Sequence, residues 1–395
     1  MPLVPSKASP RPQKGKVFRL HQPCLPHQSS PPPLFFFAYR SKEDSRYTYC
    51  MADIDALSGE LGIPWEKSKD IPFSTTVPFI GFLWDLNART VSISDSRKEK
   101  YLQAILDWEA KPKHALDEVQ KLYGKLLHAC HILPSGRAYL TSLESFMAQF
   151  HNHPFCPHSP PRRTASDLQW WKSRLLQPTL ARSIPGPTPI IDANAYLDAS
   201  SETGIGIMKG DRWRAWRLLP GWKADGRDIG WAEAVGFLLL ALALYPTTPR
   251  GSHIKVFGDN KGVVEGWWKG RSRNKPTNDI FRAVHTFTEE EGILFLTRYV
   301  PSKENPADNP SRGVYYHQSL LLLAVPIPPP IRQYLCDYDA PLTASESCLI
   351  QEGRAPAPLP RPDRALLHQD RTDLNDAFEH HARDAFSHTQ GWDEG

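Results

Sequence analysis

The chain has 395 residues and a mass of 44.7 kDa, which is enough for two or three domains that each bury their own core. Its 38 prolines, its mean hydropathy of −0.45 and its 40% of hydrophobic residues indicate folded parts separated by extended segments. A mini-protein is therefore excluded.

The net charge of +4 is unevenly distributed. Residues 1–42 contain seven lysines or arginines and no acidic residue, whereas residues 326–395 contain twelve acidic residues and six arginines. We expect residues 1–33 to form a disordered, proline-rich basic leader and residues 316–395 to form a disordered acidic tail. A basic leader is compatible with binding to phosphate backbones.

Cysteine spacing and hydropathy give an expectation about the compartment. The six cysteines are widely spaced and include no C-x-x-C, which favours free thiols over disulfides or a zinc module. The longest apolar run, residues 237–245, has nine residues, about half of the roughly 20 needed to cross a bilayer. We expect an intracellular protein of the cytoplasm or nucleus, neither secreted nor bound to a membrane.

The first half of the chain predicts a small α+β unit followed by helices. Residues 79–86 and 91–93 are typical of a β-hairpin. Apolar residues at three- and four-residue spacing then predict three helices. The first begins near Ser94, and the others span 116–132 and 138–150. Four prolines between residues 151 and 163 predict that 151–188 is a linker.

Residues 189–315 have a different pattern. Three consecutive strands are expected at 190–199, 204–208 and 213–219, followed by a helix at 231–244 and a strand at 253–258. Two helices, at 262–268 and 278–291, and a strand at 293–300 complete the pattern. This order predicts an α/β fold with a mixed sheet and flanking helices.

Four acidic residues lie where chemistry is expected in such a fold. Asp198 and Asp259 come at the ends of predicted strands, and Asp308 lies in the sequence NPADNP. Glu233 shares the apolar packing face of its helix, where an uncompensated polar group costs about 2–7 kcal/mol. A divalent cation would compensate such a cluster, and all-oxygen ligation favours Mg²⁺, with Mn²⁺ as the alternative.

These residues lie in motifs that resemble ribonuclease H domains. The first motif is YLDASS at 196–201 followed by GIGI at 204–207, the second is AEA at 232–234, and the third is VFGDN at 256–260. The sequence YVPSKENPADNPSR at 299–312 resembles the closing motif of gypsy-like or DIRS-like retroelements. All four motifs occur in the family order.

The resemblance extends upstream over roughly residues 34–315. FIGF at 79–82, the hairpin after it and the lysine-rich helix resemble the end of a reverse transcriptase palm that passes into its thumb. The resemblance implies a palm end at 34–93, a thumb-like unit at 94–150, a connection at 151–188 and a ribonuclease H-like domain at 189–315. The Tyr-x-Asp-Asp motif of the polymerase is missing, which implies a truncated polyprotein without polymerase activity and a palm supplied by another retroelement protein.

The implied activity is endonucleolytic hydrolysis of the RNA strand in RNA/DNA hybrids. Two Mg²⁺ ions would be held by Asp198, Glu233, Asp259 and Asp308. Nucleic acid would be contacted by residues of the basic segment after the third motif and of the motifs themselves: Trp267, Lys269, Arg271, Arg273, Lys275, Ser200 and Asn260.

Two alternatives stay open. The chain could be a catalytically silent, nucleic-acid-binding remnant of a retroelement. It could instead be a transposase or integrase of the same fold, which cuts DNA with carboxylates and two metal ions.

Overall fold

The computed structural model describes residues 50–62, 70–151, 153–184 and 188–354. The chain divides into two compact units, and the second unit begins at Pro78. The described part of the first unit contains helix α1 (Met51–Glu60) and the start of β1 (Thr76–Phe79). The predicted disorder of residues 1–33 and 355–395 lies outside the described residues.

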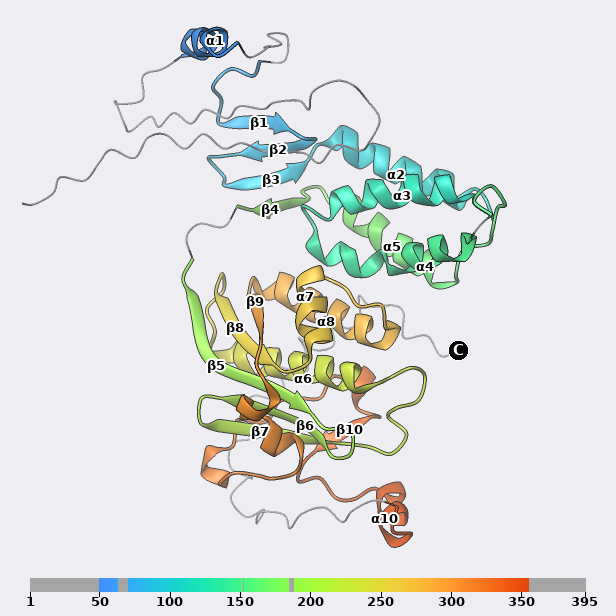
Figure 1. The fold of residues 1–395 in the computed structure, drawn as a ribbon, viewed down its shortest axis with the longest axis vertical. Coiled ribbons are helices and arrows are strands. Elements are labelled where there is room, and N and C mark those ends of the chain that lie inside the picture. The colour runs from blue at the N-terminus through green and yellow to red at the C-terminus, as the bar shows by residue number, and fades with distance from the viewer. Residues whose placement is uncertain (1–49, 63–69, 152, 185–187, 355–395) are drawn as a thin grey trace, which may run out of the picture. The chain divides into compact units, whose positions relative to one another are not determined.

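The second unit begins with a small sheet and a helical region (Figure 1). The sheet has the order β1-β2-β3-β4, and β2, β3 and β4 pair antiparallel, so the predicted hairpin is confirmed. The helical region buries a core that includes Ile105, Leu126 and Phe146. The elements of the sheet and the helical region together are β2 (Phe82–Asp85), β3 (Thr90–Ile93), α2 (Asp95–Glu109), α3 (Leu116–Ala129), the 3₁₀ turn η2 (Pro134–Tyr139), α4 (Thr141–Met147), α5 (Arg163–Leu175) and β4 (Ala181–Ser183).

The prediction that residues 151–188 are a linker is wrong for much of that segment. Helix α5 buries Leu168, Trp171 and Leu175 in the same core as α2 to α4, and β4 joins the small sheet. The four prolines on which the prediction depended end at Pro161, two residues before α5, so they mark only the connection and not the helix that follows. The helix predicted at 138–150 is interrupted, because its first residues form η2 and α4 starts at Thr141.

A six-stranded mixed sheet dominates the rest of the unit, in the order β10-β7-β6-β5-β8-β9. Strands β7, β6 and β5 pair antiparallel, whereas β5, β8 and β9 pair parallel. The predicted bounds of β5 and β8 are confirmed. The elements are β5 (Ile190–Ala199), β6 (Gly204–Lys209), β7 (Arg212–Leu218), α6 (Ile229–Leu244), β8 (His253–Gly258), α7 (Lys261–Lys269), α8 (Lys275–Glu291), β9 (Leu294–Tyr299), α9 (Asp308–Ser311), β10 (Leu335–Asp337) and α10 (Ala344–Gln351).

Helices cover the two faces of this sheet unequally. Successive side chains of a strand point to opposite faces. On β6, Ile205 faces Gly236 of α6, whereas Gly206 faces the backbone of α9. Helix α6 therefore packs on one face, with α8 against it, and the short α9 lies on the other face.

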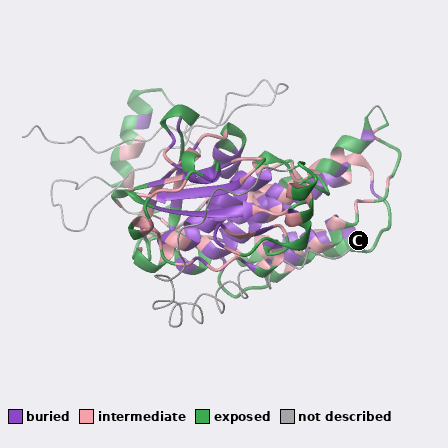
Figure 2. Cartoon of the chain, turned by 90° about the horizontal axis from the view of Figure 1, so that it is seen from below, coloured by how far each residue is buried: buried purple, intermediate pink, exposed green. Residues whose placement is uncertain are grey.

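Helix α6 is apolar on all sides because it is the central helix of the core. The side chain of Asp228 caps it by accepting a hydrogen bond from the Trp231 N–H at 3.0 Å. Among the described residues, the span Ile229–Thr247 alone is long and apolar enough to cross a membrane by length and composition. Of this apolar window, 72% is buried inside the protein, which is the burial of a core helix. Figure 2 shows in purple that buried residues are concentrated in the interior.

The prediction of a disordered tail is wrong for residues 316–354. Strand β10 pairs antiparallel with β7 and extends the sheet. The buried guanidinium of Arg217 on β7 donates to the carbonyls of Tyr338 and Ala340 and to the carboxylate of Glu346. A single arginine of β7 thus binds several acceptors of residues 316–354. These bonds order the segment, although it is rich in proline and acidic residues.

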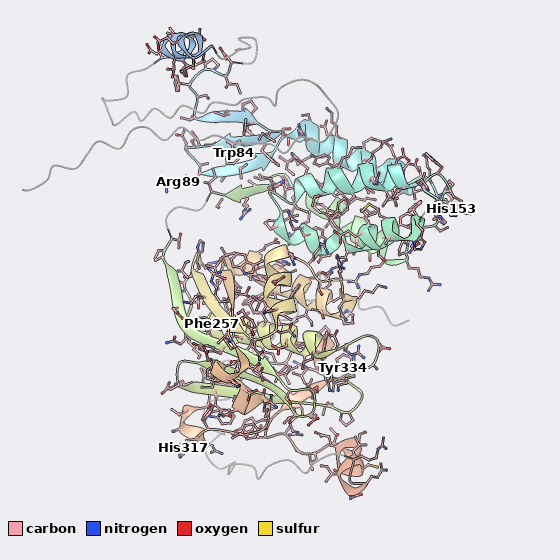
Figure 3. The ribbon with its side chains drawn as sticks, viewed as in Figure 1. Trp84, Arg89, His153, Phe257, His317 and Tyr334 are labelled. Atoms are coloured by element: carbon pink, nitrogen blue, oxygen red, sulfur yellow. The ribbon has the colours of Figure 1, made fainter. Side chains whose placement is uncertain are left out.

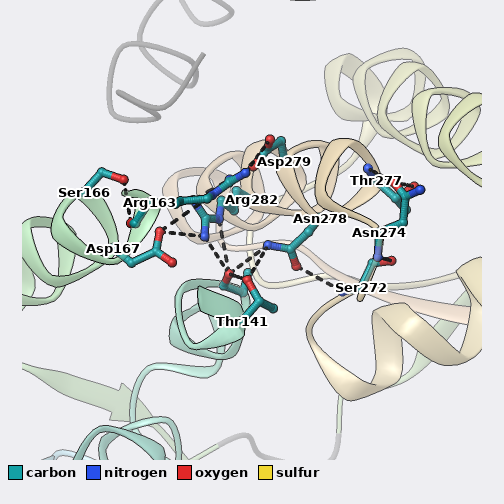
Figure 4. A network of polar contacts seen from close by, with 11 residues as sticks. Thr141, Arg163, Ser166, Asp167, Ser272, Asn274, Thr277, Asn278, Asp279 and Arg282 are labelled. Atoms are coloured by element: carbon teal, nitrogen blue, oxygen red, sulfur yellow. Dashed lines mark hydrogen bonds and ion pairs between the residues drawn. The ribbon is translucent and has the colours of Figure 1, made fainter. Parts of the chain in front are cut away.

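A buried polar network joins the helical region to α8 (Figure 4). Arg282 of α8 donates to the Ala138 carbonyl at 2.8 Å and to Asp167 of α5 at 2.8 Å. The side chains of Arg282 and Asp167 are 5% and 1% exposed. Arg163 of α5 in turn pairs with Asp279 of α8. The two regions are therefore fixed to each other by buried ion pairs and not by apolar packing alone.

Removing Arg282 is expected to destabilise the protein strongly. Arg282→Met leaves the Asp167 carboxylate buried beside one remaining arginine, and breaking a buried pair in this way costs about 3–5 kcal/mol. The control is Lys172→Met, which removes a partly exposed pair with Glu109 and is expected to cost about 0–1 kcal/mol. Urea unfolding followed by circular dichroism measures both, and equal losses would contradict a stabilising role for the network.

Candidate metal centre

Two strands and one helix bring three carboxylates together. Asp198 is the penultimate residue of β5, and Asp259 directly follows the parallel strand β8, so both lie at the carboxyl edge of the sheet. Two residues earlier on each strand, Tyr196 and Phe257 stack with ring centroids 4.8 Å apart. Of the two, Phe257 is labelled in Figure 3. Because side chains two residues apart share a face, the two aspartates are neighbours as well. Glu233 reaches them from the first turns of α6.

The three carboxylates form one compact cluster. Asp198, Glu233 and Asp259 each offer an oxygen, and these oxygens lie within 4.8 Å of one another. Glu233 is 3% exposed and Asp198 4%. Within the described ranges, no lysine, arginine or histidine forms an ion pair with any of the three. The cluster therefore concentrates negative charge in a poorly solvated place.

Hydrogen bonds compensate the cluster only in part. The Ala199 N–H donates to Oε1 of Glu233 at 3.3 Å, whereas Oε2 of Glu233 is buried and accepts no hydrogen bond. The hydroxyl of Ser311 donates to Asp198, and the hydroxyl of Ser302 donates to Asp259. A buried carboxylate oxygen without a donor indicates that a further positive partner belongs there.

The protonation equilibria reflect this environment. Burial raises the pKa of Asp198 to about 6; the Ser311 hydroxyl opposes this shift, and the nearby Asp259 carboxylate adds to it. Burial also raises the pKa of Glu233 well above its ordinary value, and the charges of Asp198 and Asp259 raise it further. Each shift has the direction that a bound cation would reverse.

The donor set fits a hard divalent cation. Three carboxylates from separate elements supply only oxygen ligands, and the described chain places no cysteine or histidine among them. The orphaned oxygen of Glu233 is an acceptor that a cation would satisfy. The three residues could thus hold a metal ion, as expected from the sequence.

Asp308, the fourth predicted ligand, is not among the residues whose oxygens lie within 4.8 Å of one another. It starts α9, is half-buried, and pairs with Arg312 at 2.7 Å. Its charge contributes to the raised pKa of Asp198, so the two carboxylates interact. The structure therefore brings three of the four predicted acids into one cluster and leaves the fourth next to it in an ion pair.

The predicted nucleic-acid contact at Trp267 is wrong, because its side chain is only 8% exposed. It donates to the Phe295 carbonyl at 3.0 Å and stacks on His285. Its neighbour Trp268 is 52% exposed instead. The sequence shows two adjacent tryptophans, and only the rotation of α7 decides which one faces the core.

The other predicted contacts divide between structural and exposed positions. Arg271 is half-buried and pairs with Glu144 of α4, and Lys269 pairs with Glu265 one turn earlier. Arg273 and Lys275 are exposed.

The two motif residues predicted to touch nucleic acid both have local structural roles. The Asn260 side chain caps α7 by accepting from the Val263 N–H. The Ser200 N–H donates to the Gly204 carbonyl at 2.8 Å and closes the hairpin between β5 and β6.

Several residues around the cluster were not predicted. Ser302 and Ser311 donate to its aspartates, as described above. Two exposed aromatic rings on the elements that follow the third motif each have a cation over one face: Arg298 lies 5.6 Å from the ring centroid of Trp268, and Lys261 lies 5.0 Å from that of Tyr299. Proximity in the sequence to the acidic motifs could have indicated these residues, since Lys261 is two residues from Asp259.

Comparison with known proteins gave no matching family model, no matching curated protein and no matching solved structure. The function proposed below is inferred from the residues and geometry of this chain.

The cluster should make the stability of the metal-free protein fall as pH rises. A carboxylate with a raised pKa binds more protons folded than unfolded between its two pKa values. For Asp198 this window runs from 3.8 to about 6. In EDTA at about pH 7.5, Asp198→Asn is expected to stabilise the chain by on the order of 1–3 kcal/mol, and near pH 4 it should have little effect.

Thermal melts of both proteins at the two pH values test this prediction. Mg²⁺ should then raise the melting temperature of the wild type more than that of the variant, since the variant lacks one ligand. If Asp198→Asn is less stable than the wild type in EDTA at neutral pH, the prediction that the Asp198 charge destabilises the metal-free protein is wrong.

Proposed function

We propose that this chain is a Mg²⁺-dependent endonuclease that hydrolyses the RNA strand of RNA/DNA hybrids. Its residues 189–315 would be a ribonuclease H-like domain joined to a palm end and thumb like those of a reverse transcriptase. The observation that carries the proposal is the buried cluster of Asp198, Glu233 and Asp259, each residue lying in one of the motifs that resemble this family.

The architecture supports the same proposal. Three antiparallel strands followed by two parallel ones, with α6 on one face, are compatible with the fold that the motif resemblance implies. Asp198 and Asp259 lie at the carboxyl ends of the parallel strands β5 and β8, where open α/β sheets place their ligands. Helix α6 is held there by the Asp228 cap and its buried surface, so Glu233 is delivered from a rigid element.

Each acidic residue would have a defined role in holding the metal ion. Asp198, Glu233 and Asp259 would hold Mg²⁺, and Asp308 would join them from α9 after exchanging its pairing with Arg312. Bound Mg²⁺ supplies Lewis acidity to a phosphate oxygen and lowers the pKa of a coordinated water. The apolar side chains around Glu233 exclude bulk water from the cluster and thereby strengthen its interaction with cations. Mn²⁺ would fit the same oxygen ligands.

Hybrid cleavage tests the proposal directly. Purified protein with Mg²⁺ and a hybrid labelled on its RNA strand is expected to release internal RNA fragments, whereas Asp198→Asn should lose this activity while staying folded. Asp192→Asn is the matched control: it is an exposed residue of the same strand β5, paired with Lys255, and its substitution should leave cleavage unchanged.

The same assay separates the two alternatives. Binding of the hybrid without cleavage by the wild type would favour the silent remnant. Preferential cleavage of duplex DNA would favour a transposase or integrase.

The exposed aromatic residue of the helix that follows the third motif should contribute to substrate binding. Stacking of a base on an aromatic side chain contributes about 1–3 kcal/mol, so Trp268→Ala is expected to weaken hybrid binding roughly 5- to 150-fold. Phe155→Ala removes an exposed ring of the helical region and serves as the control. Fluorescence anisotropy in the Asp198→Asn background avoids cleavage during the measurement, and equal affinities of the two variants would remove Trp268 from the proposed surface.

A further inference from the structure

The backbone of the closing motif approaches the sheet unusually closely next to Asp198. Gly206 on β6 is the residue directly opposite Asp198 in the strand register. A Cβ atom at Gly206 would lie 2.5 Å from the Ser311 nitrogen and 2.7 Å from the Ala307 carbonyl oxygen. Real Cβ contacts are essentially never below 3.0 Å, so only glycine allows α9 to lie where it does.

Two side chains of the same segment then fasten it to β5. Asn305 is 4% exposed and donates to the Leu197 carbonyl at 2.9 Å, and its own side-chain oxygen accepts from the Ala307 N–H. Ser311 is fully buried and its hydroxyl donates to Oδ2 of Asp198. The segment therefore contacts the backbone before Asp198 and the carboxylate of Asp198 itself.

This attachment restricts a torsion that would otherwise be free. The terminal torsion of an aspartate is broad, so a carboxylate at a strand end has no fixed orientation of its own. A buried hydroxyl on Oδ2 selects one orientation and leaves the other oxygen for a cation. Asp308 lies between Asn305 and Ser311, so the same two anchors also set its distance from the cluster.

We propose that Ser311 and Gly206 are positioning residues of the metal site: Gly206 admits the segment, and the Ser311 hydroxyl orients the Asp198 carboxylate for metal binding. This inference rests on the metal site of the proposed function and adds to it the residues that prepare that site. Substitution of groups that hydrogen-bond to metal ligands typically weakens metal affinity by about 10- to 100-fold.

Direct metal binding tests the proposal without relying on activity. The full chain is titrated with Mn²⁺ while electron paramagnetic resonance reports the free ion. Ser311→Ala is expected to bind Mn²⁺ about 10- to 100-fold more weakly than the wild type. The control is Ser252→Ala, which removes a buried serine at the opposite end of β8 and should leave the affinity unchanged.

A second pair of variants tests the steric part. Gly206→Ala should displace α9 and weaken Mn²⁺ binding at least as much as Ser311→Ala does. Gly124→Ala in α3, where an added Cβ meets no atom within 4 Å, is its control. Melting in EDTA establishes that each variant is folded. If Ser311→Ala does not fold, Gly206→Ala decides alone.

The outcomes distinguish this inference from the proposed function. Wild-type affinity in a folded Ser311→Ala or Gly206→Ala variant would overturn the positioning role and leave the nuclease proposal intact. Mn²⁺ binding by the wild type without hybrid cleavage would overturn the nuclease proposal, and the variants would still decide the positioning role. Absence of Mn²⁺ binding by the wild type would overturn both. If the role is positional, saturating Mn²⁺ should also restore most of the cleavage lost in Ser311→Ala.

Discussion

The main constraint on the second half of the chain is that its fold brings three carboxylates together at one point, two of them buried. Asp198, Glu233 and Asp259 come from β5, α6 and the end of β8, so they meet only when the sheet has its mixed order and α6 packs across it. Their mutual repulsion and the loss of hydration oppose that packing. The apolar surface of α6, which is buried on nearly all sides, supplies the opposing free energy. A fold that holds such a cluster together has three residues that could hold a metal ion.

Much of this arrangement could be predicted from the sequence because it depends on local patterns. The bounds of β5 and β8 follow from strand-like sequences, with Asp198 near the end of β5 and Asp259 directly after β8, and Glu233 stood out as a carboxylate on an apolar helical face. The elements that could not be predicted depend on distant partners. Strand β10 has three residues, and its position is set by hydrogen bonds to Arg217 on β7, far away in the sequence. The core position of α5 likewise depends on the fit of Trp171 among α2 to α4.

The environment of the acids was less accessible to sequence reasoning than the acids themselves. A serine is common in turns, and nothing local to Ser311 indicates that its hydroxyl reaches a carboxylate on β5, 113 positions away. The role of Gly206 is equally non-local, since glycine in a strand is informative only when the approaching backbone is known. The choice between Trp267 and Trp268 required the rotation of α7, which a run of nine residues with two adjacent aromatics leaves open. Local patterns thus identify which groups carry charge, whereas tertiary packing decides how those groups are oriented.

The four acids also differ in how easily they can exchange partners. Asp308 pairs with Arg312, whose side chain is 62% exposed, and an ion pair of this kind contributes only about 0–1 kcal/mol. Asp308 can therefore give up Arg312 for a cation or for a rearrangement near substrate at little loss of free energy. The buried oxygen of Glu233 has no hydrogen-bond donor to give up, so a cation that reaches it displaces only the proton favoured by the raised pKa of this carboxyl. Under the proposed function, a cation would therefore be held first by the carboxylates of Asp198, Glu233 and Asp259, and Asp308 would add a ligand whose engagement can change while the others stay fixed.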